Sequence, residues 1–420
     1  MVGTLSAVFW GVVTFSILVV LHEGGHFLTA RAFGVHVHEF MIGLPGPAIR
    51  FHGKNTDYGI TAIPLGGYVR ISGMEPGPEE PLLGPALAYV TREGSATVET
   101  LAVELGVDEG DAESILITLA DWNAISFVAE SDGVYRAKSA PEAADDPVAL
   151  LDAARAHTYR GLSTPKRILV LSAGVVVNLL AAILVFVLVL TLYGVPTPTL
   201  TIEATVPAGA AASAGLKAGD TVKSVGGTEL KDWQALLSVL AAHKPGDIVS
   251  VTVDRNGSQI TRTLTLGASA SGRALLGVSA SQTRVRLSVF EALKDSVMWI
   301  GLVFKAIGGF FNPATFKTSV SQSSSVVGIS VEVSRAVKSG PIDYAFIVAL
   351  LSLSLGVMNI LPIPPLDGGK IVLEIWEAMI GRPISRRVAI GLSATGTIVL
   401  LVFIGYLMYT DVMKYAVHGG

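Results

Sequence analysis

Residues 5–33 read LSAVFWGVVTFSILVVLHEGGHFLTARAF, and this stretch decides what kind of protein the chain forms. It is apolar up to Leu21, which is long enough for a helix of about 20 residues to cross a bilayer. No Lys or Arg precedes Arg31 and no small-residue cleavage pattern follows, so the stretch does not resemble a signal peptide. Residues 1–33 therefore predict a retained membrane helix.

The composition of the chain agrees with a membrane protein. Half of the 420 residues are hydrophobic and 15% are charged, whereas an average soluble domain has about 25% charged residues. The net charge of −4 gives no electrostatic reason to expect nucleic acid as a partner. There is no cysteine, so disulfides and thiolate metal sites are excluded. Any metal must be held by His, Asp or Glu.

Three further segments have the length and apolarity of membrane helices, at residues 166–193, 344–380 and 388–410. The third span breaks after about Ile363, where prolines follow. We predict an α-helical polytopic membrane protein with four transmembrane helices. Basic residues flank the first and third loops, which indicates that these loops are cytoplasmic and that the termini and the second loop are external. These residues are Arg31, Lys166, Arg167, Arg382, Arg386 and Arg387.

The first loop divides into two parts. Residues 34–74 alternate like strands and predict a membrane-associated β-hairpin region. Residues 75–157 predict an acidic, winged-helix-like cytoplasmic insert and linker. From Glu75 to Asp152 there are 17 acidic residues and three basic ones. Because a DNA-binding domain needs a net positive charge, a protein contact or a structural role is the better interpretation of this insert.

The second loop begins with a compact α/β module, at residues 198–282. Strand-like segments surround a helix at Trp233–Leu240. Residues 289–311 then form an amphipathic stretch, which we expect to lie on the membrane surface. The predicted strands are Thr199–Thr205, Thr221–Val225, Ile248–Arg255 and Gln259–Leu266.

The end of the first span carries the chemistry, in the sequence Leu21-His22-Glu23-Gly24-Gly25-His26. Residues four apart share a face of a helix, so His22 and His26 can present two imidazoles to one metal ion. Glu23 lies beside them, where it can accept a proton from metal-bound water. Ionisable groups inside an apolar helix are costly and usually mark function.

A catalytic zinc ion usually takes three protein ligands, and Asp367 is the candidate for the third. It follows the proline-rich break at Asn359–Leu366, where irregular backbone at membrane depth needs protein or water around it. Such a break exposes backbone groups that can pair with an extended substrate. The alternative is that Asp367 caps a helix beginning at Gly368, which is a common role of aspartate. The spacing alone leaves both possibilities open.

Four motifs together resemble the site-2 protease family, in its bacterial group of RIP zinc metalloproteases (RseP-like). They are His22–His26, Ile63–Tyr68, Ala173-Gly174 with Asn178, and Asn359–Gly369. The resemblance implies a zinc metalloendopeptidase that cuts transmembrane segments of membrane proteins in regulated intramembrane proteolysis. It implies that His22, His26 and Asp367 bind Zn²⁺, that Glu23 is the catalytic base, and that Asn359, Gly66 and Gly67 hold substrate.

The resemblance also implies a location and partners. Family members lie in the bacterial inner membrane, with the active site near the cytoplasmic side and a PDZ-like domain outside. Their substrates are single-pass proteins, either anti-sigma factors or signal-peptide remnants. Here Ala214–Asp220 followed by Val225-Gly226-Gly227 resembles one PDZ module, where some relatives have two.

The chain departs from the family pattern in three places. Val175 stands where Pro is usual, Ser325–Gly328 lacks a common proline, and Lys370 stands where His is frequent. None of these residues is an implied ligand. The acidic insert is also unusual for the family.

Two other classes of protein could carry these residues, an ion-binding transporter and a noncatalytic scaffold. Four spans without an inverted repeat argue against the transporter. The intact Glu23 argues against the scaffold, because a scaffold needs no proton acceptor between two metal ligands.

Overall fold

The structure is a computed structural model that describes residues 2–63, 66–74, 81–128, 133–140, 145–269 and 272–418. Some predicted residues lie outside this part of the chain. They are Met1 of the first span, Pro64 and Leu65 of the Ile63–Tyr68 motif, residues 75–80, 129–132 and 141–144 of the acidic insert and linker, and residues 270–271 of the α/β module. The chain divides into two compact units, one of Met1–Phe186 with Leu293–Gly420 and the other of Val187–Ala292.

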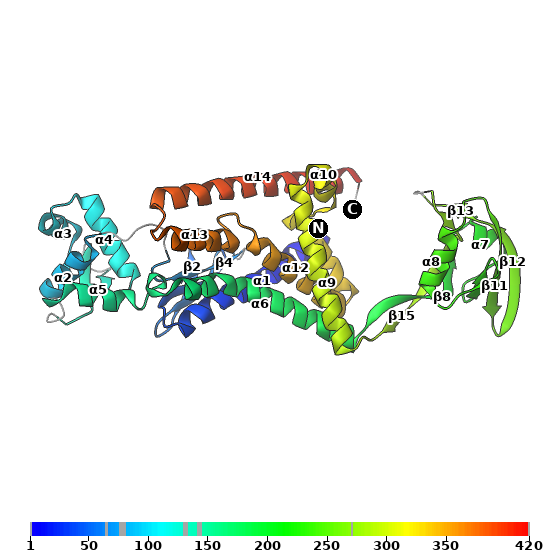
Figure 1. Cartoon of the computed structure of the whole chain (residues 1–420), viewed down its shortest axis with the longest axis horizontal. Helices are drawn as coiled ribbons and strands as arrows, with labels where there is room; N and C mark the ends of the chain where they lie inside the picture. Colours follow the sequence, from blue (N-terminus) through cyan, green and yellow to red (C-terminus); the bar gives the residue numbers. More distant parts are fainter. Residues whose placement is uncertain are drawn as a thin grey trace. The chain divides into compact units, whose positions relative to one another are not determined.

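The first unit is built on long apolar helices (Figure 1). Within the described residues, four are long and apolar enough to cross a membrane: α1 (Val2–Ala32), α6 (Thr164–Leu192), α12 (Pro341–Ile360) and α14 (Arg386–His418). Phe186 of α6 packs with Ala349 and Leu353 of α12 in a buried apolar cluster. These helices cover the four predicted spans.

The third predicted span is two helices, α12 and α13 (Asp367–Ile380), separated by residues 361–366. Proline lacks a backbone N–H and cannot continue the helix, so the break falls where the sequence predicts it. The turn is tight: a Cβ added to Gly368 would lie 2.1 Å from the Ile360 carbonyl oxygen, and one added to Gly369 would lie 2.2 Å from Pro364 N.

The helix at residues 289–308, which we expect on the membrane surface, also packs against the other helices, and its place relative to a membrane stays a prediction. α9 (Val289–Gly308) stacks Trp299 on Phe186, with ring centroids 6.3 Å apart, and sets it edge-on to Phe346. It runs through the short η3 (Gly309–Phe311) and bends by 118° into α10 (Pro313–Gln322). Taken as one span, this bent pair would be a fifth. α11 (Val326–Ser339) then packs along α1, where Ser6 and Ser334 share a hydrogen bond of 3.0 Å.

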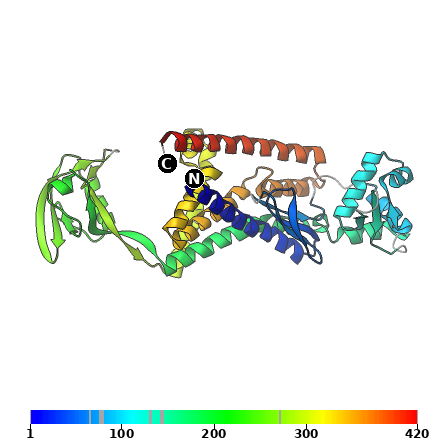
Figure 2. The ribbon, with the colours of Figure 1, turned by 180° about the vertical axis from the view of Figure 1, so that it is seen from behind.

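The region predicted as a β-hairpin is instead a four-stranded sheet. Its strands are β1 (Val37–Ile42), β2 (Ala48–His52), β3 (Asp57–Thr61) and β4 (Gly67–Ile71), in the order β2-β3-β1-β4. β1 pairs parallel with β3 and antiparallel with β4. Turns at residues 43–47 and 53–56 divide the alternating pattern, and the prediction did not count them as breaks. Figure 2 shows the sheet beside the carboxyl end of α1.

The acidic insert is a small domain with its own core, in which Leu87, Leu101, Ile115 and Leu116 are buried. Its order is helix, strand, two helices and two strands, and a fourth helix follows. The elements are α2 (Leu83–Glu93), β5 (Ser95–Ala96), α3 (Val98–Leu105), α4 (Glu109–Asp121), β6 (Ile125–Val128), β7 (Val134–Ala137) and α5 (Pro147–Arg155). The likeness to a winged helix stays a prediction.

The second unit is a sheet of six strands with two short helices, α7 (Ala210–Ser213) and α8 (Trp233–Ala241). Val222, Val251 and Leu236 lie in its core. Four strands match the predicted ones: β8 (Val195–Thr205), β9 (Thr221–Val225), β11 (Ile248–Arg255) and β12 (Ser258–Thr265). The prediction missed β15 (Val278–Val285), which pairs antiparallel with β8. The short β10 (Thr228–Glu229) pairs with β9, and β13 (Gly267–Ala268) pairs with β14 (Ala274–Leu275).

Candidate metal centre

His22 and His26 lie one turn apart near the carboxyl end of α1, and glycines bring α6 against them. A Cβ added to Gly174 of α6 would lie 2.4 Å from His26 Nε2 and 2.8 Å from His22 Cε1. A Cβ added to Gly25 of α1 would lie 2.5 Å from the Ala173 carbonyl oxygen. The two helices can therefore approach this closely only because both positions lack a side chain.

Asp367 reaches the same place from α13. Its Oδ2 atom lies 3.0 Å from His22 Nε2 and 3.2 Å from His26 Nε2, and the two Nε2 atoms are 3.4 Å apart. One potential ligand atom from each residue lies within 4.8 Å of the others. His22, His26 and Asp367 are all buried. The structure thus brings the three predicted ligands together from two segments more than 340 positions apart.

The start of α13 also tests the alternative that Asp367 caps a helix beginning at Gly368. α13 begins at Asp367 with Leu366 in the capping position, and no side chain caps this end by a hydrogen bond. Asp367 turns its carboxylate towards the histidines instead. The capping interpretation is therefore wrong.

Hydrogen bonds behind the histidines determine which nitrogen faces the centre. His26 Nδ1 lies 2.8 Å from the Val170 carbonyl oxygen, which can only accept, so Nδ1 carries the proton and Nε2 keeps a lone pair. The amide of Asn178 lies behind His22, 3.4 Å from its Nδ1. Asn178 Oδ1 is buried without a hydrogen bond, and a half-turn of the amide would let it accept the Nδ1 proton. Such outer partners orient metal-binding imidazoles.

The donor set fits a metal ion. Asp367 Oδ2 is buried and accepts no hydrogen bond from any residue that the structure describes, although two imidazole nitrogens lie close to it. Its other oxygen lies 3.9 Å from Lys370 Nζ, a contact that the sequence analysis missed although it singled out Lys370. Lone pairs that converge in a buried place repel one another unless a cation lies between them. Two imidazoles and one carboxylate are a common catalytic zinc set, which leaves one position open.

One predicted substrate-binding glycine, Gly67, lies close to the predicted base Glu23. Gly67 begins β4, and a Cβ added there would lie 2.7 Å from Val19 Cγ1 and 3.8 Å from Glu23 Cγ. Gly66 has φ +96° and its carbonyl accepts from Gly43 N at 2.8 Å. Asn359 donates from Nδ2 to the Leu355 carbonyl at 3.1 Å, within α12. No contact joins Asn359 to the ligands among the described residues.

One positioning cluster was not predicted. Glu374, two turns along α13 from Asp367, receives Arg167 at 2.9 Å and the Tyr159 hydroxyl at 3.0 Å. Arg167 stands at the start of α6, so the cluster ties α13 to α6. Burial and the neighbouring Glu374 carboxylate raise the pKa of Tyr159 well above its usual range. The sequence feature that could have predicted this cluster is the charged Glu374 within the apolar run Ile371–Trp376.

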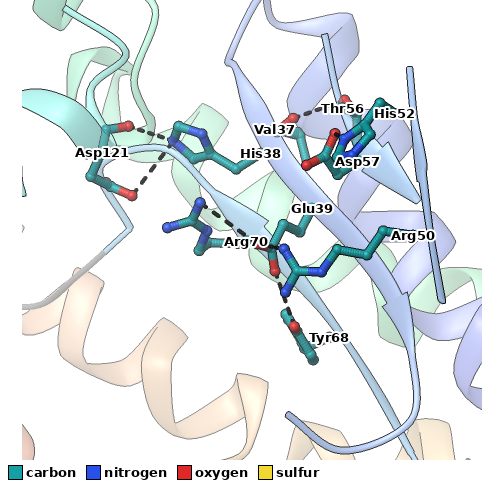
Figure 3. A network of polar contacts seen from close by, with 10 residues as sticks. All are labelled: Val37, His38, Glu39, Arg50, His52, Thr56, Asp57, Tyr68, Arg70 and Asp121. Atoms are coloured by element: carbon teal, nitrogen blue, oxygen red, sulfur yellow. Dashed lines mark hydrogen bonds and ion pairs between the residues drawn. The ribbon is translucent and has the colours of Figure 1, made fainter. Parts of the chain in front are cut away.

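A network of polar contacts joins the sheet beside the metal centre to the acidic insert, and Figure 3 shows part of it. Asp121, at the end of α4, accepts from Gly73 N at 2.8 Å through its carboxylate and from the Ser72 hydroxyl at 2.6 Å through its carbonyl. His38 of β1 lies 2.6 Å from the same carbonyl, and burial lowers the pKa of His38. The acidic insert is thus docked on the strands that lead to Gly67.

A pair of imidazoles and a carboxylate inside a bundle of apolar helices, with a glutamate next to the first imidazole, defines an integral membrane metalloprotease. The family model described as Peptidase family M50 matches residues 10–403. The chain therefore belongs to Peptidase family M50, the site-2 proteases, and is a metalloendopeptidase.

Individual relatives match over nearly the whole chain. Zinc metalloprotease RasP of Geobacillus kaustophilus is 27% identical over 424 residues, which cover 99% of this chain and 100% of that one. The probable protease eep of Enterococcus faecalis is 29% identical, with 96% and 98% covered. Among solved structures, the PDZ domain of the SdrC-like protein of Listeria monocytogenes is 20% identical and covers 20% of this chain and 90% of that one, at a TM-score of 0.19.

Proposed function

We propose that this metalloprotease is a zinc-dependent intramembrane endopeptidase that cuts the transmembrane segments of single-pass membrane proteins. The observation that carries the proposal is the buried group of His22, His26 and Asp367, whose ligand atoms lie within 4.8 Å of one another on apolar helices. The relatives named zinc metalloproteases support zinc as the metal.

His22 Nε2, His26 Nε2 and Asp367 Oδ2 would hold the ion. Zinc bound there would act as a Lewis acid that polarises a peptide carbonyl. The proton held on His26 Nδ1 by Val170 keeps Nε2 free to bind. Lys370, near the other oxygen of Asp367, would help to keep the carboxylate ionised.

Glu23 would serve as the base. It is next to His22 in sequence and does not belong to the ligand group. Its carboxylate would take a proton from the attacking water and pass it to the leaving amine. The missing side chain of Gly67 lets β4 lie against α1 beside Glu23, because a Cβ there would lie 2.7 Å from Val19 Cγ1.

The substrate would have to be extended at the cut, because a helix hides its carbonyl groups in its own hydrogen bonds. Gly66 and Gly67 at the start of β4 and Asn359 before the helix break would hold the extended segment. We place the metal centre near the cytoplasmic side of the bacterial inner membrane and the PDZ-like domain outside. Anti-sigma factors or signal-peptide remnants would be the substrates.

The proposal is tested with a panel of single-span membrane proteins co-expressed with the wild-type chain or with Glu23→Gln. We expect new fragments, cut within the membrane segment, with the wild type only. Removal of a general base typically costs about 10²- to 10⁴-fold in rate. Zinc content measured on both purified proteins should be equal. Cleavage by Glu23→Gln at the wild-type rate would remove Glu23 from the mechanism.

A further inference from the structure

A cavity of about 680 Å³ lies between the sheet beside the metal centre and the acidic insert. Its volume is in the range of pockets that hold ligands. The side chains that bear on its chemistry come from β4 on one side and from α4, β6 and the end of β7 on the other. They are Val69, Arg70, Ile71, Ile117, Phe127 and Lys138. The function proposed above makes no use of this cavity.

The strand β4 leads from the metal centre to the cavity. Its first residue, Gly67, lies beside Glu23, and its last three, Val69–Ile71, line the cavity. Successive side chains of a strand point to opposite faces, so a cavity that touches three in a row reaches the backbone edge of the strand. β4 stands last in the order β2-β3-β1-β4, and no strand among the described residues pairs with its outer edge.

An extended segment held at Gly67 can therefore continue along β4 into the cavity. Strand residues advance by about 3.3 Å each, so Val69–Ile71 lie about 7 to 13 Å from Gly67 along the strand. The residues of the segment that reach the cavity are then about two to four positions from the one opposite Gly67. The insert belongs to a loop that we expect in the cytoplasm, so these residues lie on the cytoplasmic side of the cut.

The insert presents exposed apolar side chains to the cavity. Ile117 of α4 is 50% exposed and Phe127 of β6 is 55% exposed. The insert forms its buried core without either of them, although the Phe127 ring lies 5.2 Å from that of Tyr135. An apolar side chain that covers this surface removes it from water, which stabilises the contact.

The charges of the cavity favour a carboxylate over a basic group. Figure 3 shows two of the lining residues, Arg70 and Asp121. Asp121 accepts a backbone N–H at 2.8 Å on one oxygen, and its other oxygen lies 3.6 Å from His38 Nε2. Arg70 lies 3.9 Å from Glu39, which a second arginine also contacts. Lys138 forms no ion pair with any residue that the structure describes.

We propose that this cavity binds the cytoplasmic flank of the substrate and favours a flank with an apolar side chain and a carboxylate over a basic one. The inference rests on the function proposed above and gives the acidic insert a part in substrate choice. Cytoplasmic flanks of membrane spans usually carry Lys and Arg. The cavity would therefore select the smaller group of single-span proteins whose flank is acidic at this distance from the cut.

Two model substrates test the charge preference. They share one transmembrane segment and a leucine in the flank, and they differ in a single flank residue, Glu or Lys, about three positions from the mapped cut. Cleavage is measured with the full-length, zinc-loaded protein in detergent. We expect kcat/KM to be about two- to fivefold higher for the Glu substrate, which is the size of an exposed ion pair. The difference should lie in KM.

Variants of the protein separate recognition from folding. Lys138→Glu should reverse the preference between the two substrates, which a merely structural role of Lys138 would not do. Phe127→Ser should raise KM for both substrates several-fold, because apolar contact surface is lost. Val103→Ser is its matched control, since Val103 is 84% exposed on α3 and does not line the cavity. Arg92→Glu is the charge control, because Arg92 pairs with Glu93 elsewhere on the insert.

Photo-crosslinking tests the site without cleavage. A photoreactive residue replaces the variable flank residue, and Glu23→Gln keeps the substrate uncut. We expect crosslinks to residues 69–71, 117–127 or 138. The proposal is overturned if the wild type cuts both substrates equally, if Lys138→Glu leaves the preference unchanged, if either control variant acts like its cavity counterpart, or if crosslinks fall elsewhere. A wild type that cuts neither substrate would contradict the proposed function, and the crosslinks would still decide whether the flank lies in the cavity.

Discussion

Each of the two units of the protein buries an aspartate, and the two carboxylates have opposite surroundings. Asp220, 1% exposed, receives Arg255 at 2.6 Å on Oδ1 and at 2.8 Å on Oδ2, and Lys217 N at 2.8 Å. Asp367, 6% exposed, faces two imidazole nitrogens and has an oxygen without a hydrogen bond. The first carboxylate is fully satisfied by the chain itself.

The difference separates a structural ion pair from a binding site. The side-chain hydrogen bonds from Arg255 hold the pKa of Asp220 below its usual range, and nothing further is needed. At Asp367 the nearest groups offer lone pairs, so the arrangement is complete only when a cation joins it. A buried aspartate whose neighbours are acceptors is therefore a better indication of a metal site than burial alone.

Exchanging each aspartate for asparagine tests this comparison most strongly. Asp367→Asn should lower zinc affinity by more than the roughly 10- to 100-fold typical of outer-shell changes, and cleavage should fall with it. Asp220→Asn should keep zinc and cleavage but destabilise the second unit by about 1.5–3 kcal/mol, because Arg255 loses a charged hydrogen-bond partner.

Zinc content, cleavage rate and thermal unfolding measured on the same preparations separate the two effects. Full zinc occupancy and activity in Asp367→Asn would mean that the third ligand is another residue. Loss of zinc in Asp220→Asn would mean that the second unit contributes to the metal site.

Substitution of glycines tests whether the close approach of α6 to α1 positions the two histidines. Gly174→Ala places a Cβ 2.4 Å from His26 Nε2, so the imidazoles must move. We expect zinc affinity to fall about 10- to 100-fold, as for other changes that misorient ligands. Gly24→Ala is the matched control, because a Cβ there meets nothing within 4 Å. Equal zinc affinity in the two variants would show that the approach of α6 is not what positions the ligands.

Removing most of the second unit tests whether it takes part in the chemistry. A deletion of residues 195–285 removes β8 and β15 together, as it must because these two strands pair with each other. A short flexible linker suffices, because a Cβ on Gly194 would lie 2.6 Å from the Val285 carbonyl oxygen.

The second unit could act only by keeping substrates with large external parts away from the metal centre. In that case the deletion protein should cut a short substrate at a rate within about twofold of wild type. It should cut a full-length substrate, with its external part intact, several-fold faster than wild type. The twofold limit corresponds to roughly 0.5 kcal/mol, which is the size of effect expected for surface changes away from a site. A deletion protein that is folded and loaded with zinc but cuts neither substrate would show that the unit is needed for catalysis.

The smallest expected effect is on acid stability. Because the folded-state pKa of Asp220 is depressed, its stabilisation is present above the unfolded value of about 3.9 and is lost as pH falls through the folded value. The protection factors of the β11 amides against hydrogen exchange should therefore fall below about pH 4, because β11 carries Arg255. In Asp220→Asn this contribution should be absent at every pH. An unchanged acid response in that variant would assign the effect to other carboxylates.

The spacing of His22 and His26 alone predicted two imidazoles on one helix face, because the repeat of a helix is a local property. Local patterns also predicted the spans, the break at the prolines and the strands β9 and β11 of the second unit. In each case the deciding information lies within a few residues, as apolar length, alternation or a missing N–H.

Contacts between distant segments had to come from the tertiary structure. Strand alternation from 34 to 74 could not say that β1 pairs with β3 and β4 in one sheet, or that β15 returns to β8. The spacing left Asp367 between ligand and cap, and only the approach of α13 to α1 turned its carboxylate towards His22. A single chain's local periodicity carries no record of which distant residues meet, so the sequence by itself determined the elements and the chemistry they carry, while packing determined which of them form a site.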